Sequence, residues 1–352
     1  MRAGIYLGKE RIELRELPIP EVGDNDVLIR NIYSSVCGTD VAVFMHGPGT
    51  GHKVEVGGEF GHETVSRVVA AGKNVTDFTV GERVYPYPRY VTGDERRAGT
   101  IGGFSEYILA RDARRDYSLY AVDERISDRL ASLIEPFTVG CRAAWRGMIP
   151  CGEARYVVGQ NAVVFGCGTI GIAATVALKW FGMDKVMVCD RSEFRLDLAR
   201  ELGFVACNVE AGDFAEVARA YFGEAPSLDG ATADIDCWLD AAGAESILDD
   251  FQRLGKIESR FVSVAVNNKP RNVDLLRMSY AQQSLIGSGG YMPEDVRDVQ
   301  QIMASGRWDL ERIITHEFSL DELELAIRTA ADVEHAGNVV VRMSGGPSGR
   351  AD

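Results

Sequence analysis

The sequence has no uninterrupted apolar run long enough to cross a bilayer, because a spanning helix needs about 20 such residues. Its start, MRAGIYLGKERIELRELP, becomes charged too early for the apolar segment of a signal peptide. Basic residues are also in deficit, with 38 Lys and Arg against 52 Asp and Glu and a formal net charge of −14. Such a surface repels phosphate backbones and anionic headgroups, so we expect a cytoplasmic protein that binds neither nucleic acid nor membranes.

Cysteine is scarce as well. The seven cysteines form an odd set without any CxxC pair, and they are scattered through apolar stretches. This pattern argues against a disulfide framework. We expect most of them to be small buried side chains, with Cys37 as the exception because its sequence neighbourhood differs.

What is present is an ordinary globular composition. The 352 residues are 46% hydrophobic and 26% charged, and about 150 residues per domain predicts two domains. Residues 1 to about 125 contain short alternating segments between turn residues, which predict a mainly β half. The predicted strands of this half are Arg11–Leu17, Asp26–Ser34, Glu63–Ala71, Glu82–Tyr87 and Phe104–Leu109.

From Asn161 onward, strand and helix patterns alternate, which predicts parallel strands joined by crossover helices and hence an α/β fold. A stretch from about Leu285 to Arg342 ends in a strand, Asn338–Arg342, that we expect to pack back on the first half. The predicted elements between these points are the strands Asn161–Phe165, Lys185–Cys189, Ile235–Leu239 and Arg260–Val266 and the helices Thr169–Phe181, Ser192–Leu202, Pro293–Ala304 and Leu320–Ala331.

A glycine-rich turn connects the first of these strands to its helix. Gly166, Gly168 and Gly171 form the pattern G-x-G-x-x-G, in which they permit a tight turn, a close approach of a pyrophosphate and close helix–strand packing. The helix N-terminus supplies unpaired N–H groups for the phosphates. The turn therefore predicts a dinucleotide site.

Asp190 ends the next predicted strand, 19 residues after Gly171. A carboxylate at this distance accepts hydrogen bonds from the ribose 2′-OH and repels a 2′-phosphate, which favours NAD. Capping of the following helix is the alternative role. Arg191 and Arg195 retain NADP as a second choice, because either guanidinium can attract a 2′-phosphate.

The first half contains a candidate metal group. Cys37 and His62 offer a thiolate and an imidazole that suit Zn²⁺, and a carboxylate can complete a tetrahedral site. The two residues lie 25 positions apart, so spacing alone does not define a site, and a buried Cys and a core His are the default interpretation.

Taken together, these motifs resemble those of the zinc-dependent branch of the medium-chain dehydrogenase/reductase family, most closely the sorbitol, threonine and related polyol or sugar dehydrogenases. The resemblance spans nearly the whole chain. It rests on the following segments in order: Val36-Cys-Gly-Thr-Asp40, Gly61-His-Glu63, Gly81-Glu-Arg-Val84, Gly102-Gly-Phe-Ser-Glu-Tyr107, Glu135-Pro136 and the glycine turn.

The resemblance implies a GroES-like catalytic domain that contains an inserted Rossmann domain. The implied limits are 1–150 for the first catalytic part, 151–287 for the NAD-binding domain, 288–343 for the returning catalytic part and 344–352 for a disordered tail. The residues implied to bind the cofactor are Gly166, Gly168, Thr169, Ile170, Gly171, Asp190, Arg191, Arg195, Ala242, Gly243, Val266, Ser288 and Gly289.

The family also implies zinc chemistry. Cys37, His62 and Glu63 occupy the positions of catalytic zinc ligands, and Glu135 occupies that of a carboxylate that binds the metal directly or through water, so either glutamate can be the direct ligand. In the family the ion lowers the pKa of the substrate hydroxyl before hydride passes to the nicotinamide. Thr39 matches the hydroxyl that relays the proton, with capping of a helix at Val41–Phe44 as the alternative.

The sequence departs from the family pattern at several places. No cysteine lies between Tyr85 and Gly103, where relatives hold a second, structural zinc, so we expect one zinc per subunit. Ala42 replaces the usual relay histidine, for which His46 or His52 is a hypothetical substitute.

The implied substrate contacts are Arg89 and Tyr291. Arg89 belongs to the segment that replaces the structural-zinc lobe. Tyr291 follows a glycine here, whereas an arginine precedes the matching tyrosine in sorbitol dehydrogenases. A solvated loop is the alternative role for Arg89.

We therefore expect an oxidoreductase that transfers hydride between NAD and a secondary alcohol of a polyol, sugar, cyclitol or hydroxy-amino compound, with or without a phosphate. The alternatives are a zinc-free enone or quinone reductase and a non-catalytic nicotinamide-binding protein. Relatives are dimers or tetramers, so a homodimer or homotetramer is expected, with Arg260–Val266 and Ser284–Gly287 as interface candidates.

Overall fold

The computed structural model describes residues 1–49, 54–149, 159–266 and 269–343. The chain forms two compact units. The first unit comprises Met1–Glu135, Leu310–Asp332 and the chain from Ala336 on, and the second comprises Pro136–Asp309 and Val333–His335. The chain therefore changes unit at 135/136, 309/310, 332/333 and 335/336. The domain limits expected from the sequence stay a prediction. The expected disordered tail lies outside the described residues.

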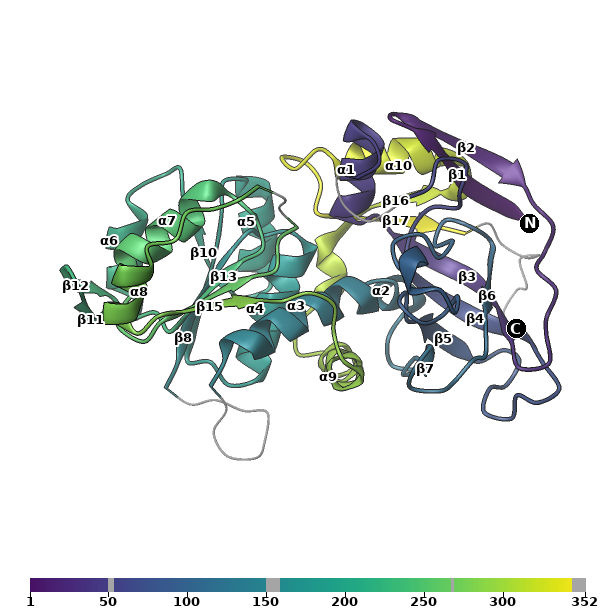
Figure 1. The fold of residues 1–352 in the computed structure, drawn as a ribbon, viewed down its shortest axis with the longest axis horizontal. Coiled ribbons are helices and arrows are strands. Elements are labelled where there is room, and N and C mark those ends of the chain that lie inside the picture. The colour runs from purple at the N-terminus through teal and green to yellow at the C-terminus, as the bar shows by residue number, and fades with distance from the viewer. Residues whose placement is uncertain (50–53, 150–158, 267–268, 344–352) are drawn as a thin grey trace. The chain divides into compact units, whose positions relative to one another are not determined.

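The first unit is built around a seven-stranded sheet whose main path runs β16-β17-β3-β4-β5-β7, with β6 paired to β3 (Figure 1). The returning strand β17 pairs antiparallel with β3, which confirms that the end of the described chain packs on the first half. The elements of this unit are β1 (Arg2–Gly8), β2 (Arg11–Glu16), β3 (Val27–Ser35), α1 (Gly38–His46), β4 (Glu63–Ala71), β5 (Arg83–Pro86), η1 (Glu95–Arg97), β6 (Tyr107–Ala110), β7 (Leu119–Ala121), α2 (Asp128–Ala131), η2 (Leu310–Ile313), β16 (Ile314–Ser319), η3 (Leu320–Glu322), α10 (Leu323–Ala330) and β17 (Asn338–Arg342).

The second unit contains a six-stranded parallel sheet in the order β10-β9-β8-β13-β14-β15. This order reverses direction at β8, which is the topology of a doubly wound dinucleotide-binding fold, and it confirms the predicted fold class. The elements of this unit are β8 (Asn161–Phe165), α4 (Thr169–Trp180), β9 (Lys185–Asp190), α5 (Glu193–Glu201), β10 (Val205–Asn208), α6 (Phe214–Phe222), β11 (Glu224–Ser227), β12 (Gly230–Ala233), β13 (Cys237–Asp240), α7 (Glu245–Leu254), β14 (Arg260–Ser263), α8 (Leu275–Ala281), β15 (Ser284–Gly287) and α9 (Pro293–Ala304), while α3 (Ile134–Gly147) begins in the first unit and continues into the second.

The structure adds features to the second unit that the sequence pattern did not reveal. A two-stranded hairpin, β11–β12, precedes β13, and α9 belongs to the second unit, although the stretch after Leu285 was expected to return to the first half. The edge strand β15 extends the parallel sheet beside β14. No helix among the described residues is long and apolar enough to span a membrane.

Candidate functional site

The candidate metal group lies where β3 ends and β4 begins. Ser35 of β3 pairs with Glu63 of β4, so the two residues that follow Ser35 bring Cys37 next to His62 and Glu63. One ligand atom from each of these three residues lies within 4.8 Å of the other two. His62 and Glu63 are buried and Cys37 is partly buried. A pairing of antiparallel strands thus brings together residues that are 25 positions apart in the sequence.

Asp40 orients two members of this group, a role that the sequence pattern did not reveal. Its carboxylate accepts a hydrogen bond from the Cys37 backbone N–H at 3.0 Å, and it lies 3.6 Å from Nδ1 of His62. A carboxylate at Nδ1 favours the tautomer whose Nε2 is available to a cation. An acidic residue three positions after a candidate ligand, at the start of a helix, is the sequence signal that could have identified it.

The electrostatics of the group fit a cation. Oε2 of Glu63 is buried and accepts no hydrogen bond from the described residues. Burial raises the pKa of Glu63, against the opposing effects of His62 and Ser35. Burial and the Glu63 carboxylate raise the pKa of the Cys37 thiol to about 12. A metal ion would offset both burial costs, because it favours the thiolate and coordinates the orphaned oxygen.

His62 is electrostatically coupled to the same groups. Burial lowers its pKa, but Asp40 and Cys37 outweigh burial, and the net pKa of His62 is raised well above its ordinary value. Burying several ionisable side chains around one point costs folding free energy unless a charge of opposite sign binds among them. The donor set of thiolate, imidazole and carboxylate suits Zn²⁺.

Thr39 and Glu135 are two further predicted site residues of the first unit. The Thr39 hydroxyl donates a hydrogen bond to Sγ of Cys37 at 3.0 Å, and its backbone N–H completes the cap of α1. Cys37 is therefore the N-cap of α1, so the capping hydroxyl that was the alternative role of Thr39 is not what the structure shows; the Thr39 hydroxyl lies against a candidate ligand instead. Glu135 is buried in the first turn of α3 and is not one of the three residues that share the 4.8 Å group.

The cofactor turn lies in the second unit. Gly166 has a φ of +99°, which favours glycine, and a Cβ on Gly171 would lie 1.7 Å from the Gly166 carbonyl oxygen. α4 then begins at Thr169 with Gly168 as its N-cap and without a side-chain cap, and a helix N-terminus of this kind favours an anion. Thr169 and Ile170 occupy the first turn of this helix.

A cavity of about 640 Å³ opens beside this turn, and it lies entirely within the second unit. Seven predicted cofactor residues line it, and the sequence pattern did not identify several others that complete it. The predicted lining residues are Gly166, Gly168, Asp190, Arg191, Arg195, Ala242 and Gly243, and the additional ones include Phe165, Cys189, Val209, Phe214, Ile247, Asp250 and Val333.

The remaining predicted cofactor residues lie elsewhere in the second unit. Val266 follows β14 and is 69% exposed, whereas Ser288 and Gly289 follow the edge strand β15. None of the three is among the residues that line this cavity. Their predicted contact with the cofactor stays a prediction.

Asp190 is held firmly at the cavity. Its two carboxylate oxygens accept hydrogen bonds from the backbone N–H groups of Cys167 at 2.6 Å, Arg191 at 2.7 Å and Ser192 at 2.9 Å. These bonds tie the end of β9 to the glycine turn. Ser192 separately caps α5, so the capping role that was the alternative for Asp190 belongs to its neighbour.

The predicted substrate residues lie in different units. Arg89 of the first unit is exposed, pairs with Glu95 at 2.9 Å and lies over the ring of Tyr90. Tyr291 of the second unit is buried. His46 is exposed at the end of α1, and His52 lies outside the described residues.

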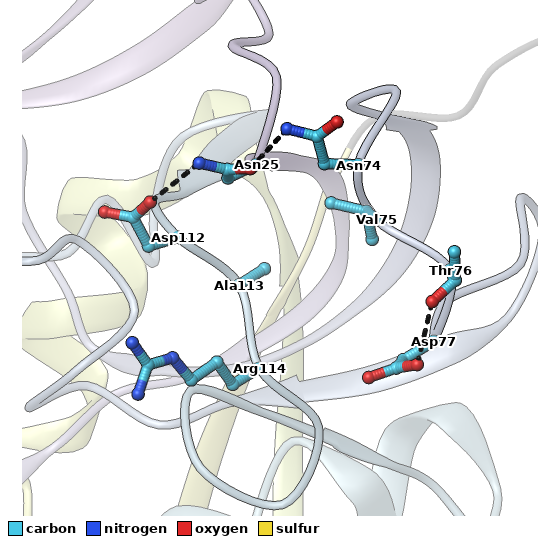
Figure 2. A pocket seen from close by; sticks show the side chains of 8 residues that line it. All are labelled: Asn25, Asn74, Val75, Thr76, Asp77, Asp112, Ala113 and Arg114. Carbon is cyan, nitrogen blue, oxygen red and sulfur yellow. Dashed lines mark hydrogen bonds between the residues drawn. The ribbon is translucent and has the colours of Figure 1, made fainter.

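A further cavity of about 270 Å³ lies in the first unit, and Figure 2 shows its lining. Asn25 connects Asn74 and Asp112 through hydrogen bonds of 2.9 and 3.4 Å. Amide and carboxylate groups of the loops dominate it, and no cysteine or histidine lines it. It therefore lacks the donor set of the candidate metal group.

A mainly β unit with a cysteine–histidine–carboxylate group, joined to a doubly wound unit with a dinucleotide turn, defines the class of zinc-type alcohol dehydrogenases. Two family models match the chain, namely the alcohol dehydrogenase GroES-like domain over residues 23–117 and the zinc-binding dehydrogenase over residues 169–305. The chain belongs to the medium-chain dehydrogenase/reductase superfamily of alcohol dehydrogenases, and it is an oxidoreductase.

Individual relatives agree with this assignment. L-Threonine 3-dehydrogenase of Serratia proteamaculans (strain 568) is 28% identical over 334 residues, which cover 90% of this chain and 92% of the relative. The solved structure of 2R,3R-butanediol dehydrogenase from Bacillus subtilis has a TM-score of 0.82 at 22% identity, with 97% of this chain and 99% of that chain covered. Galactitol-1-phosphate dehydrogenase from Escherichia coli has a TM-score of 0.79 at 20% identity, with 97% and 100% covered. The family binds zinc and a nicotinamide cofactor.

Proposed function

We propose that the protein is an NAD-dependent dehydrogenase with a single zinc, which oxidises a secondary alcohol of a polyol, sugar, cyclitol or hydroxy-amino compound, with or without a phosphate. The observation that carries the proposal is the buried group of Cys37, His62 and Glu63 in a chain whose second unit holds a dinucleotide cavity. The relatives named above, which include a threonine and a butanediol dehydrogenase, support this substrate class.

Cys37, His62 and Glu63 are the proposed zinc ligands, and Glu135 is the alternative carboxylate. When bound, zinc supplies a Lewis acid that lowers the pKa of an alcohol hydroxyl. Asp40 holds His62 in the required tautomer and anchors the Cys37 backbone. The donor set contains one cysteine, and the segment from Tyr85 to Gly103 contains none, which supports one zinc per subunit.

Thr39 is the proposed proton carrier next to the ligands. Its hydroxyl lies 3.0 Å from Sγ of Cys37 and can rotate between an acceptor and a donor role. A substrate hydroxyl at this point passes its proton to Oγ1 while Oγ1 releases its own proton toward solvent. Because Ala42 cannot continue the relay, the proton leaves through water or through the exposed His46.

Asp190 supports NAD over NADP. Both of its oxygens already accept backbone N–H groups, and a carboxylate with lone pairs at this point attracts the two ribose hydroxyls but repels a phosphate. Arg191 and Arg195 line the same cavity and supply the opposite charge. NADP is therefore the weaker of the two proposed cofactors.

The remaining assignments belong to the same proposal. Arg89 and Tyr291 are proposed to contact the substrate. Val266, Ser288 and Gly289 are proposed to bind the cofactor. The edge strand β15 has unpaired backbone groups on one side, which supports a homodimer or homotetramer formed through this edge. The acidic surface supports a cytoplasmic location.

The test combines metal analysis with a substrate panel. Purified protein should contain one zinc per chain and reduce NAD, more efficiently than NADP, with at least one polyol, cyclitol or hydroxy-amino compound. Cys37→Ser should lose the zinc and at least about 100-fold of activity, because a metal ligand is removed. The matched control, Cys237→Ala, changes a buried cysteine of the second unit and should retain both.

Three outcomes would count against the proposal. Full activity after complete zinc removal would indicate a zinc-free reductase of the same fold. NAD binding without turnover on any alcohol or ketone would indicate a non-catalytic protein. Two zinc ions per chain would contradict the single-zinc assignment.

A further inference from the structure

Two cysteines outside the metal group face each other in the second unit. Cys189 of β9 and Cys207 of β10 are direct partners in the parallel register of these strands. Neighbouring strands lie about 4.8 Å apart, and disulfide-bonded cysteines have Cα atoms about 4.4–6.8 Å apart. Both side chains belong to one core cluster on the same face of the sheet. The backbone thus meets the separation that a bond between the two sulfurs requires.

The pair is poised for reaction at the edge of the sheet. β10 is an edge strand, and Cys207 is 7% exposed, whereas Cys189 is 1% exposed. A hydrogen bond from the Cys189 thiol lowers the pKa of Cys207 to about 7, with burial opposing and Arg200 of α5 assisting this shift. The thiolate is the nucleophilic form of cysteine. By contrast, burial raises the pKa of Cys167 and of Cys237 to about 12.

The pair also adjoins the cofactor cavity. Cys189 lines the cavity, together with Phe165 and Phe214 from the same core cluster. Cys189 directly precedes Asp190, whose carboxylate binds the backbone of the glycine turn. A covalent bond from Cys189 to Cys207 of the edge strand would therefore shift a residue that lines the cavity and, with it, the neighbouring Asp190.

We propose that Cys189 and Cys207 form a redox-sensitive dithiol, which a peroxide closes to a disulfide that weakens NAD binding in the adjacent cavity. The cofactor part of this inference rests on the proposed function. The Cys207 thiolate attacks one oxygen of hydrogen peroxide, the O–O bond breaks, and protonation of the leaving hydroxide gives water and a sulfenic acid. The Cys189 sulfur then attacks the Cys207 sulfur, the S–S bond forms, and the second oxygen leaves as water. The two thiols lose two electrons, which the peroxide accepts.

The test treats zinc-loaded protein with hydrogen peroxide and maps its disulfides by alkylation, digestion and mass spectrometry. The expected result is a peptide pair linked through Cys189 and Cys207. Isothermal titration should then show the dissociation constant for NAD raised about tenfold, with recovery after dithiothreitol. Cys207→Ser and Cys189→Ala should each remove both effects, and the matched control Cys237→Ala should keep both. Circular dichroism identifies a variant that fails to fold, in which case the other variant decides.

The formation of the disulfide and its effect on NAD binding are tested separately. Absence of the Cys189–Cys207 linkage, while other thiols of the treated protein are oxidised, would overturn the dithiol. A linkage with unchanged NAD affinity would overturn its effect on the cofactor. Failure of the reduced protein to bind NAD would overturn the proposed cofactor and this effect together, while the mass spectrum still decides whether the disulfide forms.

Discussion

At the scale of single residues, charge and hydrogen bonding explain why Cys37 and His62, the proposed ligands, suit a metal ion. Asp40 lies between them, because it accepts from the Cys37 backbone and faces Nδ1 of His62. Burying these ionisable side chains without a metal costs folding free energy. The carboxylate of Asp40 fixes the orientation of the His62 ring and of the Cys37 backbone. The proposed metal site thus includes a positioning residue, Asp40, that is not itself one of the proposed ligands.

Asp40→Asn tests this orientation. The amide oxygen can still cap α1, but it removes the negative charge next to His62, so the affinity for zinc should fall about 10- to 100-fold with little change in folding. Competition with a chromophoric chelator measures this affinity. Asp213→Asn, at the exposed cap of α6 in the second unit, is the control and should bind zinc like the wild type. A change of less than about twofold in Asp40→Asn would contradict the assigned role.

The ionisation of Cys207 has its own pH signature. Because its pKa is lowered to about 7 by the Cys189 thiol, with Arg200 assisting, Cys207 is deprotonated above that pH and protonated below it. Its alkylation by iodoacetamide should rise between about pH 6 and 8 and then level off. Mass spectrometry of timed samples measures the rate, with the buried Cys237 as an unreactive reference. A rate that still climbs steeply above pH 9 would indicate an ordinary thiol.

At the scale of elements, the junction of β8 and α4 is the best-determined part of the cofactor site. The strand ends at Phe165, the chain turns at Gly166, and the helix begins at Thr169 with Gly168 as an N-cap that has no side chain to cap it. Close packing within this turn leaves no room for a Cβ at Gly171. The element therefore needs glycine for steric reasons as well as for phosphate binding.

Gly171→Ala tests the steric requirement. The new methyl would lie 1.7 Å from the Gly166 carbonyl oxygen, so the turn must open, at a cost of about 3 kcal/mol or more in unfolding free energy. NAD binding should weaken as well. Chemical denaturation and cofactor titration measure the two effects. Gly212→Ala, where a Cβ meets nothing within 4 Å, is the control, and equal stability of the two variants would refute the argument.

At the scale of the whole molecule, the two chemistries reside in separate compact units. The candidate metal group lies in the first unit and the dinucleotide cavity in the second, and the chain changes unit within α3 and again at 309/310, 332/333 and 335/336. Each unit has its own sheet and its own core clusters. Binding of the metal and binding of the cofactor are therefore expected to be largely independent.

Metal removal tests this independence. Dialysis against a chelator should remove the zinc and abolish turnover, yet the dissociation constant for NAD should change by no more than about threefold, because the metal group and the cofactor cavity are built from different residues. Titration calorimetry of the loaded and stripped protein measures this. Reloading with Zn²⁺ should restore turnover. A loss of NAD affinity beyond tenfold would show that the units are strongly coupled.

The sequence by itself determined the features that depend on neighbours in the chain. The glycine turn, Asp190 at the end of the next strand and the alternation of strands and helices are local patterns, and the structure has β8 and β9 within one residue of their predicted limits. The Cys37 and Gly61-His-Glu63 motifs were likewise readable, although their convergence followed only from the resemblance. The hairpin β11–β12 was missed because its strands are short and largely exposed.

Only the tertiary structure decided which distant residues meet. The pairing of Ser35 with Glu63 brings the ligand atoms together, the contact of Asp40 with His62 orients them, and the register of β9 and β10 places Cys189 opposite Cys207. It also assigned α9 to the second unit, which its helical periodicity does not specify. The physical reason is that periodicity and turn chemistry report on adjacent residues, whereas strand register and side-chain packing depend on contacts that close only when the whole sheet forms.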